Sequence, residues 1–244
     1  MGRVHLIGAD HAVLGDLAAA SAAPGIDVAI SRGARPKEYS VGEPNEDVVA
    51  AVTGPEAALL AVADAFTGPE SSRAAIEAVL AAAGDPPPAA LDASGALDLL
   101  EAANEAALAA TAADREAFGW RGASRTTLVV AHLAGRRLTW AAMKDSALFV
   151  ARPGRTRRLD TPTSKSISFP MTRADLEAAA SAGAEDLEPG DAVVLVTDGF
   201  TDVAGRHELS DLAAAGRLTA EAVVALALAR DTSDNVAAAV AHVT

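Results

Sequence analysis

Acidic side chains end several of the short apolar runs in this sequence. The aspartates at such positions are Asp47, Asp64, Asp145, Asp198 and Asp234. A carboxylate at the mouth of a hydrophobic strand is costly to desolvate unless a cation or a hydrogen-bond donor meets it. Taken singly, each aspartate is compatible with an ordinary cap of a turn or helix. Their recurrence, with Glu46 and Asp202 beside two of them, indicates that they act together.

Clustered carboxylates favour one kind of ligand. Acids that share a site repel one another, and several of them must hold protons unless a cation is bound. Mg²⁺ and Mn²⁺ prefer oxygen ligands, and two such ions about 3.5–4 Å apart can lower the pKa of a bridging water and hold a phosphoryl oxygen. The pattern therefore predicts hydrolysis of a phosphate ester in which no residue has to act as a covalent nucleophile.

The composition restricts the other function classes. The formal net charge of −13 argues against a nucleic-acid partner, because affinity for phosphate backbones comes from Lys and Arg. The chain has no cysteine, so disulfides, thiolate zinc sites and thiol nucleophiles are excluded. Its five histidines are scattered and predict no histidine-based metal site. Neither a G-x-x-x-x-G-K-[ST] loop nor a G-x-G-x-x-G motif is present.

Length and hydropathy predict one domain. The 244 residues contain no linker-like stretch, so we expect a single domain over residues 1–244. Half of the residues are hydrophobic but only 3% are aromatic, so the core must be built from Ala, Val and Leu. The first residues make a poor signal peptide, and no apolar run approaches the ~18 residues of a membrane span. We therefore expect a cytoplasmic protein with no membrane partner.

Strand and helix patterns alternate along the chain. We expect strands at residues 3–8, 25–30, 48–52, 126–133, 138–143, 147–150, 192–196 and 236–243. We expect helices at residues 71–83, 91–118, 172–180, 207–214 and 219–229. The Ala-rich stretch between the first two strands is compatible with a helix. Residues 57–65 are ambiguous, because propensity favours a helix whereas a strand ending at Asp64 suits the metal-site hypothesis. The mixture, with largely antiparallel strands, predicts the α+β class.

One basic cluster stands out on this acidic chain. Arg152, Arg155, Arg157 and Arg158 fall within residues 152–166, which we expect to form a loop. The simpler interpretation is a solvated hairpin end. The functional interpretation is a landing site for a phosphorylated or acidic protein partner, because guanidinium groups bind phosphate and carboxylate in a bidentate manner.

The acidic motifs follow a recognisable order. They are Asn45-Glu46-Asp47, Ala63-Asp64-Ala65, Gly122-Ala123-Ser124, Lys144-Asp145-Ser146, Thr197-Asp198-Gly199 with Asp202, and Ser233-Asp234-Asn235. In order and context they resemble the metal-dependent PPM family of serine/threonine phosphatases (protein phosphatase 2C type). The resemblance implies an α-β-β-α sandwich, in which two antiparallel sheets are flanked by helices and metals bind in a cleft at one edge.

The resemblance also implies how the metals are held. Asp64 would bridge two Mg²⁺ or Mn²⁺ ions, and Asp198 and Asp234 would complete the first site. The backbone carbonyl of Ala65 would serve the second ion.

Other acids have supporting roles by the same resemblance. Glu46 and Asp47 would hold metal-coordinated waters, and a third ion, if one binds, would be held by Asp145. Within this set, we expect catalysis to depend on Asp47, Asp64 and Asp198.

The sequence departs from the family pattern at three positions. Gly42 stands where the family commonly has an arginine that grips the substrate phosphate. Phe66 replaces a histidine that can protonate the leaving alcohol, and its loss removes general acid help that contributes about 10²–10⁴-fold. Lys144 replaces the usual glycine before Asp145, where its ammonium group can compete with a third metal. The alternative phosphate ligands ahead of Asp47 are Arg32, Arg35 and Lys37.

These observations support more than one function. The first hypothesis is Mg²⁺- or Mn²⁺-dependent hydrolysis of phosphoserine or phosphothreonine in proteins. The second is a metal-binding relative of low or no activity that acts as a regulatory partner, which the residues at positions 42 and 66 motivate. The third is a phosphatase of small phosphorylated metabolites.

Overall fold

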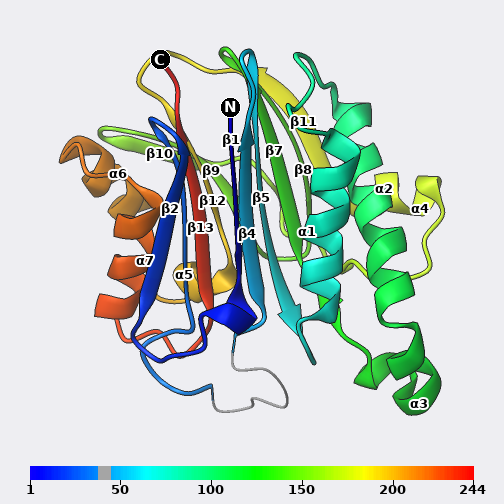
Figure 1. The fold of residues 1–244 in the computed structure, drawn as a ribbon. Coiled ribbons are helices and arrows are strands. Elements are labelled where there is room, and N and C mark those ends of the chain that lie inside the picture. Colours follow the sequence, from blue (N-terminus) through cyan, green and yellow to red (C-terminus); the bar gives the residue numbers. More distant parts are fainter. Residues whose placement is uncertain (38–44) are drawn as a thin grey trace.

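Two antiparallel β-sheets pack face to face at the centre of the protein (Figure 1). The computed structural model describes residues 1–37 and 45–244. Within these residues the larger sheet has the order β1 (Gly2–Ile7), β4 (Asp47–Thr53), β5 (Ala57–Phe66), β7 (Leu128–Ala134), β8 (Arg137–Met143) and β11 (Ser181–Asp186), with β6 (Arg125–Thr126) paired to β5. The smaller sheet has the order β10 (Arg155–Arg158), β9 (Ala147–Arg152), β12 (Ala192–Val196), β13 (Val236–His242), β3 (Ile26–Ser31) and β2 (Leu17–Ala23).

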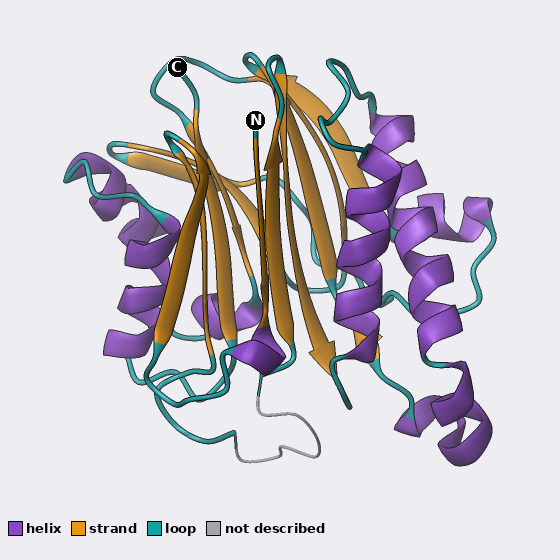
Figure 2. Ribbon diagram, in the orientation of Figure 1, coloured by secondary structure: helices purple, strands orange, loops and turns teal. Residues whose placement is uncertain are grey.

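Helices cover the outer face of each sheet, as Figure 2 shows. The larger sheet is covered by α1 (Glu70–Ala83), α2 (Ala93–Ala110) and α4 (Arg173–Ala179). The smaller sheet is covered by α5 (Asp198–Thr201), α6 (Arg206–Ala214) and α7 (Ala220–Ala229). A 3-10 turn, Gly8–Asp10, follows β1, and α3 (Ala112–Gly122) projects beyond the helical layer at the lower edge of Figure 1. The predicted α+β architecture, an α-β-β-α sandwich, is thereby confirmed.

The layers follow from strands that are buried on both faces. Along β5, Leu60 and Val62 point into the core between the sheets, whereas Leu59 and Ala61 pack under α1 and α2. Each of these four side chains is at most 1% exposed. A strand between two apolar layers reads as a continuous hydrophobic run, and this explains why residues 57–65 also satisfy a helical pattern.

The prediction of a helix in the first Ala-rich stretch is wrong, because these residues form the edge strand β2. Ala18, Ala20 and Ala22 pack against the inner core with the period of two that a strand requires. The pairing of β2 with β3 outweighs the helical propensity of alanine.

Three further boundaries differ from the sequence-based expectation. The long helix expected at 91–118 is divided into α2 and α3 at Thr111, whose buried hydroxyl hydrogen-bonds Ser168 Oγ at 3.0 Å. Residues 155–158 form strand β10 rather than a loop. The edge strand β11 was not expected; its Gly183 lies against the ring of Trp140, where an added Cβ would come within 2.6 Å.

The described part of the chain contains no helix that is both long and apolar enough to cross a membrane.

Candidate functional site

Two aspartates face each other on neighbouring strands of the larger sheet. The β4–β5 hairpin closes through Gly54, whose N–H donates to Ala57 O at 2.8 Å, and its register places Asp47 opposite Asp64. Asp47 is fully buried and Asp64 is 8% exposed. Opposed like charges on adjacent strands are destabilising, so this pair has a cost to the fold.

The electrostatics of the pair reflect that cost. Burial raises the pKa of Asp47 to about 7, although Lys37 opposes the change. Burial, followed by repulsion from Asp47 and Asp198, raises the pKa of Asp64 well above its ordinary range. Desolvation and like charge both favour the neutral form of a carboxyl group. A cation bound between the two strands would reverse this preference.

Strand β12 of the smaller sheet brings a third aspartate to the same end of the sandwich. Thr197 follows β12, and its hydroxyl donates to Asp47 Oδ2 at 2.8 Å, which joins the two sheets. The same hydroxyl oxygen accepts from the N–H of Ala237 at 2.9 Å. Asp198 comes next and begins α5. Gly199 is required here, because an added Cβ would lie 1.9 Å from Asn235 O.

Asp198, Asp202 and Asp234 form a compact group of carboxylates. One oxygen from each lies within 4.8 Å of the others. Burial, then repulsion from Asp234 and Asp145, raises the pKa of Asp198 to about 6. Burial and the same two neighbours raise the pKa of Asp202. Asp202 and Asp198 lie four residues apart at the two ends of the short helix α5, which places both carboxylates beside the 231–235 loop.

Glu46 and Asn235 connect this loop to strand β4. The N–H of Glu46 donates to Asn235 Oδ1 at 3.0 Å, and the Asn235 amide donates to Arg32 O at 3.0 Å. Glu46 is 8% exposed, its Oε1 accepts from the N–H of Gly68 at 2.5 Å, and burial raises its pKa. These bonds hold segments that are distant in sequence in one arrangement around the acids.

Lys37 supplies a positive charge within the acidic group. Its Nζ lies 2.5 Å from Asp234 Oδ1 and 3.7 Å from Glu46 Oε2. Burial acts to lower the pKa of Lys37, but the carboxylates of Asp234, Asp47 and Asp64 raise it above its ordinary value. The other two predicted phosphate ligands are engaged elsewhere. Arg32 donates to Ala12 O at 2.7 Å, and Arg35 pairs with exposed Asp231 at 2.8 Å.

The donor set fits a hard divalent cation. Asp47 Oδ1 and Asp198 Oδ1 are buried without a hydrogen-bond partner in the described part of the chain. An unsatisfied buried carboxylate oxygen is costly, and coordination to a cation removes that cost. Apart from the Lys37 ammonium group, the side chains that converge here offer carboxylate oxygens, the ligand type of Mg²⁺ and Mn²⁺. Two ions held this way would supply an acidified water and neutralise phosphoryl oxygens.

The remaining predicted residues lie beside the carboxylate group. Ala65 is buried and follows Asp64 in β5. The side chain of Asp145 is 41% exposed and contacts the ammonium group of Lys144. The ring of Phe66 lies under the Arg125 guanidinium, at 4.7 Å, and 5.9 Å from Lys144 Nζ. Gly42, the other departure from the family pattern, lies outside the described residues.

The structure adds residues that the sequence-based site prediction omitted. Asp202 belongs to the carboxylate group, and the spacing of four residues after Asp198 was the available signal. Thr197 and Asn235 orient Asp47 and Glu46 through hydrogen bonds across the two sheets. No local pattern marks such residues, because their partners are more than 100 positions away.

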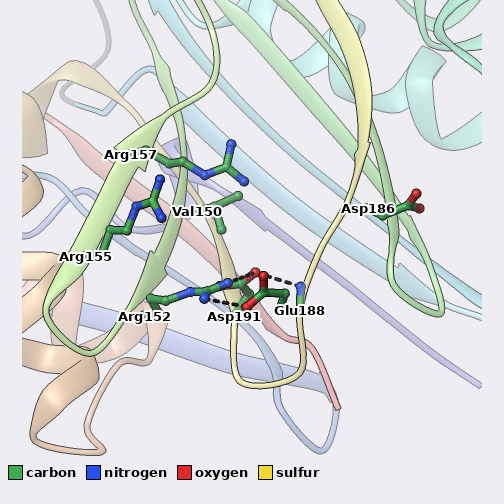
Figure 3. A pocket seen from close by; sticks show the side chains of 7 residues that line it. All are labelled: Val150, Arg152, Arg155, Arg157, Asp186, Glu188 and Asp191. Atoms are coloured by element: carbon green, nitrogen blue, oxygen red, sulfur yellow. Dashed lines mark hydrogen bonds and ion pairs between the residues drawn. The ribbon is translucent and has the colours of Figure 1, made fainter.

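Three arginines of the basic cluster, Arg152, Arg155 and Arg157, line a small pocket at the other end of the smaller sheet (Figure 3). Arg158 lies nearer the acids, where it donates to Asp145 O at 3.2 Å. Arg152 binds Asp191 through Nε at 2.7 Å and Nη2 at 2.9 Å. Arg157 pairs with Glu185, and Arg158 pairs with buried Asp160 at 2.7 Å. Within the described residues, Arg155 alone of the four has no carboxylate partner. The cluster therefore serves mainly internal ion pairs.

A sandwich of two antiparallel sheets with acids gathered at one end is the architecture of the PPM phosphatases. The family profile described as "Protein phosphatase 2C" matches residues 36–235. The chain therefore belongs to the protein phosphatase 2C family. No curated protein matches the sequence.

Solved structures agree with this assignment of the fold. The S. agalactiae serine/threonine phosphatase matches with a TM-score of 0.70 at 16% identity, over 93% of this chain and 100% of that chain. The catalytic domain of the serine/threonine phosphatase PstP, solved in complex with two manganese ions, matches with a TM-score of 0.65 at 21% identity, over 93% and 97%. The Mycobacterium tuberculosis phosphatase PstP/Ppp matches with a TM-score of 0.63 at 23% identity, over 93% and 98%.

Proposed function

We propose that this phosphatase hydrolyses phosphoserine and phosphothreonine in proteins with Mg²⁺ or Mn²⁺ as cofactor. The observation that carries the proposal is the convergence of carboxylates on one end of the sandwich. Oxygens of Asp198, Asp202 and Asp234 lie within 4.8 Å of one another, and Asp47 Oδ1 and Asp198 Oδ1 are buried without a hydrogen-bond partner in the described residues. These carboxylates would hold divalent cations, which would supply an acidified water and offset the charge of the phosphoryl oxygens.

The acidic residues at this end of the sandwich have different roles in this proposal. Asp64, Asp198 and Asp234 hold the metals, with Asp202 as a further ligand. Asp47 orients coordinated water, and its carboxylate is itself held by the hydroxyl of Thr197.

Several other positions have supporting parts. Glu46 orients a second water, and Asp145 offers a place for a third ion. The carbonyl of Ala65 serves the second metal. Lys37 binds the substrate phosphate in place of the arginine that the family commonly has, since its ammonium group already lies among the carboxylates.

A kinetic experiment tests the proposal. The purified protein should hydrolyse p-nitrophenyl phosphate with Mn²⁺ and lose that activity in EDTA. Asp198→Asn should lower kcat/KM more than about 100-fold, because loss of even an outer partner of a metal ligand costs up to about that factor. Asp211→Asn, which changes an exposed carboxylate on α6, is the matched control. Full activity in Asp198→Asn would refute the assignment.

The same assay assigns the phosphate ligand. At saturating Mn²⁺, Lys37→Gln should raise KM for p-nitrophenyl phosphate about tenfold, because a hydrogen bond to a charged group is removed. Arg35→Gln should leave KM unchanged, since Arg35 pairs with Asp231. The opposite pattern would move the phosphate ligand from Lys37 to Arg35.

A second candidate, a metal-binding regulatory protein of low activity, is favoured by residues beside the carboxylate group. Phe66 cannot donate a proton, and Lys144 neutralises Asp145 by direct contact. Calorimetry that shows tight Mn²⁺ binding, together with no turnover of any phosphopeptide, would support this candidate over the first.

A further inference from the structure

The few aromatic residues of this protein are unevenly placed. The chain has five Phe, two Trp and one Tyr. Trp140, Phe149 and Phe200 are buried in the cores. The other rings of the described residues, Phe66, Phe118, Trp120 and Phe169, lie between α3 and the end of β5 that carries Asp64. In a core built from small side chains, this concentration of partly exposed rings beside the acidic group calls for a role other than packing.

Rings and cations alternate along this surface, which we call the aromatic track. Its members, in order of contact from α3 inward, are Arg115, Trp120, Phe169, Arg125, Phe66 and Lys144.

At the outer end of the aromatic track two rings are stacked. The Arg115 guanidinium lies 5.0 Å from the ring centre of Trp120, which stacks on Phe169 at 5.7 Å with 9° between the planes. Asn104 holds Phe169 in place, since its Nδ2 donates to Phe169 O at 2.8 Å and its Oδ1 accepts from Phe169 N at 3.2 Å. Trp120 is nevertheless 45% exposed, so part of its apolar surface is open to a ligand.

At the inner end Arg125 lies between two rings. Its guanidinium is 5.7 Å from the ring centre of Phe169 and 4.7 Å from that of Phe66. Arg125 Nε is buried without a hydrogen-bond partner, and within the described residues Arg125 forms no ion pair with a carboxylate. Lys144 lies on the same Phe66 ring and contacts Asp145, whose charge raises the pKa of Asp198. The aromatic track thus reaches the acidic group at Lys144, and its inner part contains a guanidinium, that of Arg125, with no carboxylate partner among the described residues.

These observations indicate the chemistry of the occupant. The aromatic track carries three cations, Arg115, Arg125 and Lys144, on a chain of net charge −13. These cations attract an acidic ligand to this surface, whereas the acidic group beside it repels one. The row of rings from Trp120 to Phe66 suits an extended peptide, because an extended segment can run along several partly exposed aromatic side chains and pack an apolar side chain on them. The unpaired Arg125 suits a phosphate or carboxylate.

We propose that the aromatic track docks the substrate segment that flanks the phosphorylated residue, and that it selects acidic segments with an apolar side chain. The apolar side chain packs on Trp120 and Phe169, and acidic groups bind Arg125 and Lys144. This inference rests on the proposed phosphatase function. It also assigns a role to Phe66, whose ring contacts the cations of Arg125 and Lys144 at the edge of the acidic group.

The test compares two exposed aromatic residues of α3. Trp120→Ala removes a ring of the aromatic track, whereas Phe118→Ala removes a ring that is 72% exposed and stacks on no other ring of the described residues. Activity is measured with p-nitrophenyl phosphate and with two phosphoserine peptides of equal length. One carries glutamates and a leucine beside the phosphoserine, and the other carries lysines and glycine. Melting temperatures verify that the variants are folded.

The wild type should prefer the acidic peptide to the basic one. Trp120→Ala should lower the ratio of kcat/KM for the acidic peptide to that for p-nitrophenyl phosphate about tenfold, and Arg125→Gln should remove the preference for acidic over basic peptide. Phe118→Ala should leave both ratios within about twofold. Equal effects of the two α3 substitutions would overturn the inference, as would hydrolysis of p-nitrophenyl phosphate without hydrolysis of either peptide.

Failure of the proposed function is distinguishable from failure of the docking inference. If the wild type hydrolyses neither peptide nor p-nitrophenyl phosphate with any divalent ion, the function is wrong, and fluorescence anisotropy of the labelled acidic phosphopeptide then decides the inference. Binding that Trp120→Ala weakens about tenfold and Phe118→Ala does not would support it. Binding that neither substitution changes, or no binding, would overturn it.

Discussion

An aspartate flanks each end of strand β12, and the two differ in what neutralises their charge. Asp191 precedes the strand, its side chain is 1% exposed, and both of its oxygens accept from Arg152. Asp191 Oδ2 also accepts from the N–H of Glu188 at 2.9 Å. Burial acts to raise the pKa of Asp191, but the guanidinium of Arg152 holds it below its ordinary value. At this end of β12 the charge of Asp191 is neutralised by a side chain of the protein itself.

Asp198, after the other end of β12, is in the opposite state. Its neighbours include Asp234 and Asp145, burial and these charges raise its pKa to about 6, and its Oδ1 has no partner in the described residues. A buried carboxylate with a bidentate guanidinium is a structural element. A half-buried carboxylate among other carboxylates costs stability, and a bound cation would remove that cost. The contrast separates an end whose charge is neutralised by an ion pair from the end that we propose binds metal.

The largest expected effect concerns metal affinity. Asp198→Asn should lower the affinity for Mn²⁺ at least about 100-fold, because a direct ligand matters more than its outer partners. Asp191→Asn should leave the affinity within a few-fold, since Asp191 lies at the far end of the strand. Isothermal calorimetry of both variants makes the measurement. Similar losses in the two variants would remove the distinction between the ends of β12.

The second expected effect is on stability, and here Asp191→Asn should be the more affected variant. Asp191→Asn should lower the free energy of unfolding by about 2 kcal/mol, because hydrogen bonds to a charged partner are weakened and a guanidinium loses its counter-charge. Asp198→Asn should leave metal-free stability unchanged or raise it, because a repelled charge is removed. Urea unfolding in EDTA measures both values. A larger loss in Asp198→Asn than in Asp191→Asn would contradict this assignment.

The smallest effect is a pH dependence that distinguishes the two ends. The pKa of Asp47 is about 7 in the folded protein and about 3.9 in an unfolded chain, so the folded state binds a proton more tightly. Stability of the metal-free protein should therefore rise as the pH falls from about 8 towards 5. Between pH 8 and about pH 6.5 we expect Tm to increase by about 3 °C, the shift that corresponds to about 1 kcal/mol in a chain of this size.

Two controls isolate the source of that trend. Asp47→Asn should reduce it, and saturating Mn²⁺ should abolish it, because a bound cation favours the ionised acids. Asp191 has a lowered pKa, so its contribution is retained above about pH 4 and is constant over the same range. A Tm that falls from pH 8 to 5 in EDTA would show that carboxylate repulsion is not what limits the metal-free protein.

Much of the fold could be predicted from the sequence, because strands in a two-sheet sandwich are apolar runs and turns carry Gly and Pro. The strand at residues 192–196 and the helix at residues 219–229 were predicted in this way. The prediction failed for β2 and for β11, where Ala and Gly carry too little hydrophobic signal to distinguish a strand. Those strands exist because a neighbouring strand pairs with them.

The candidate site divides in the same manner. Asp47, Asp64, Asp198 and Asp234 stand at the ends of apolar runs, and the order of their motifs resembles the phosphatase family. Both are local properties that can be read along the chain. The basic cluster was equally visible, yet Arg152 and Arg157 pair with Asp191 and Glu185, which no local pattern connects to them.

The amino-acid sequence by itself determined which side chains carry charge, which runs are apolar, and that acids recur where those runs end. Pairing between distant segments determined which charges are satisfied. Asp47 and Asp64 oppose each other through the register of a hairpin, whereas Thr197 reaches Asp47 only because the two sheets pack together. The physical reason is that the cost of a buried carboxylate depends on what lies within a few ångströms of it, and residues far apart in the chain supply those neighbours.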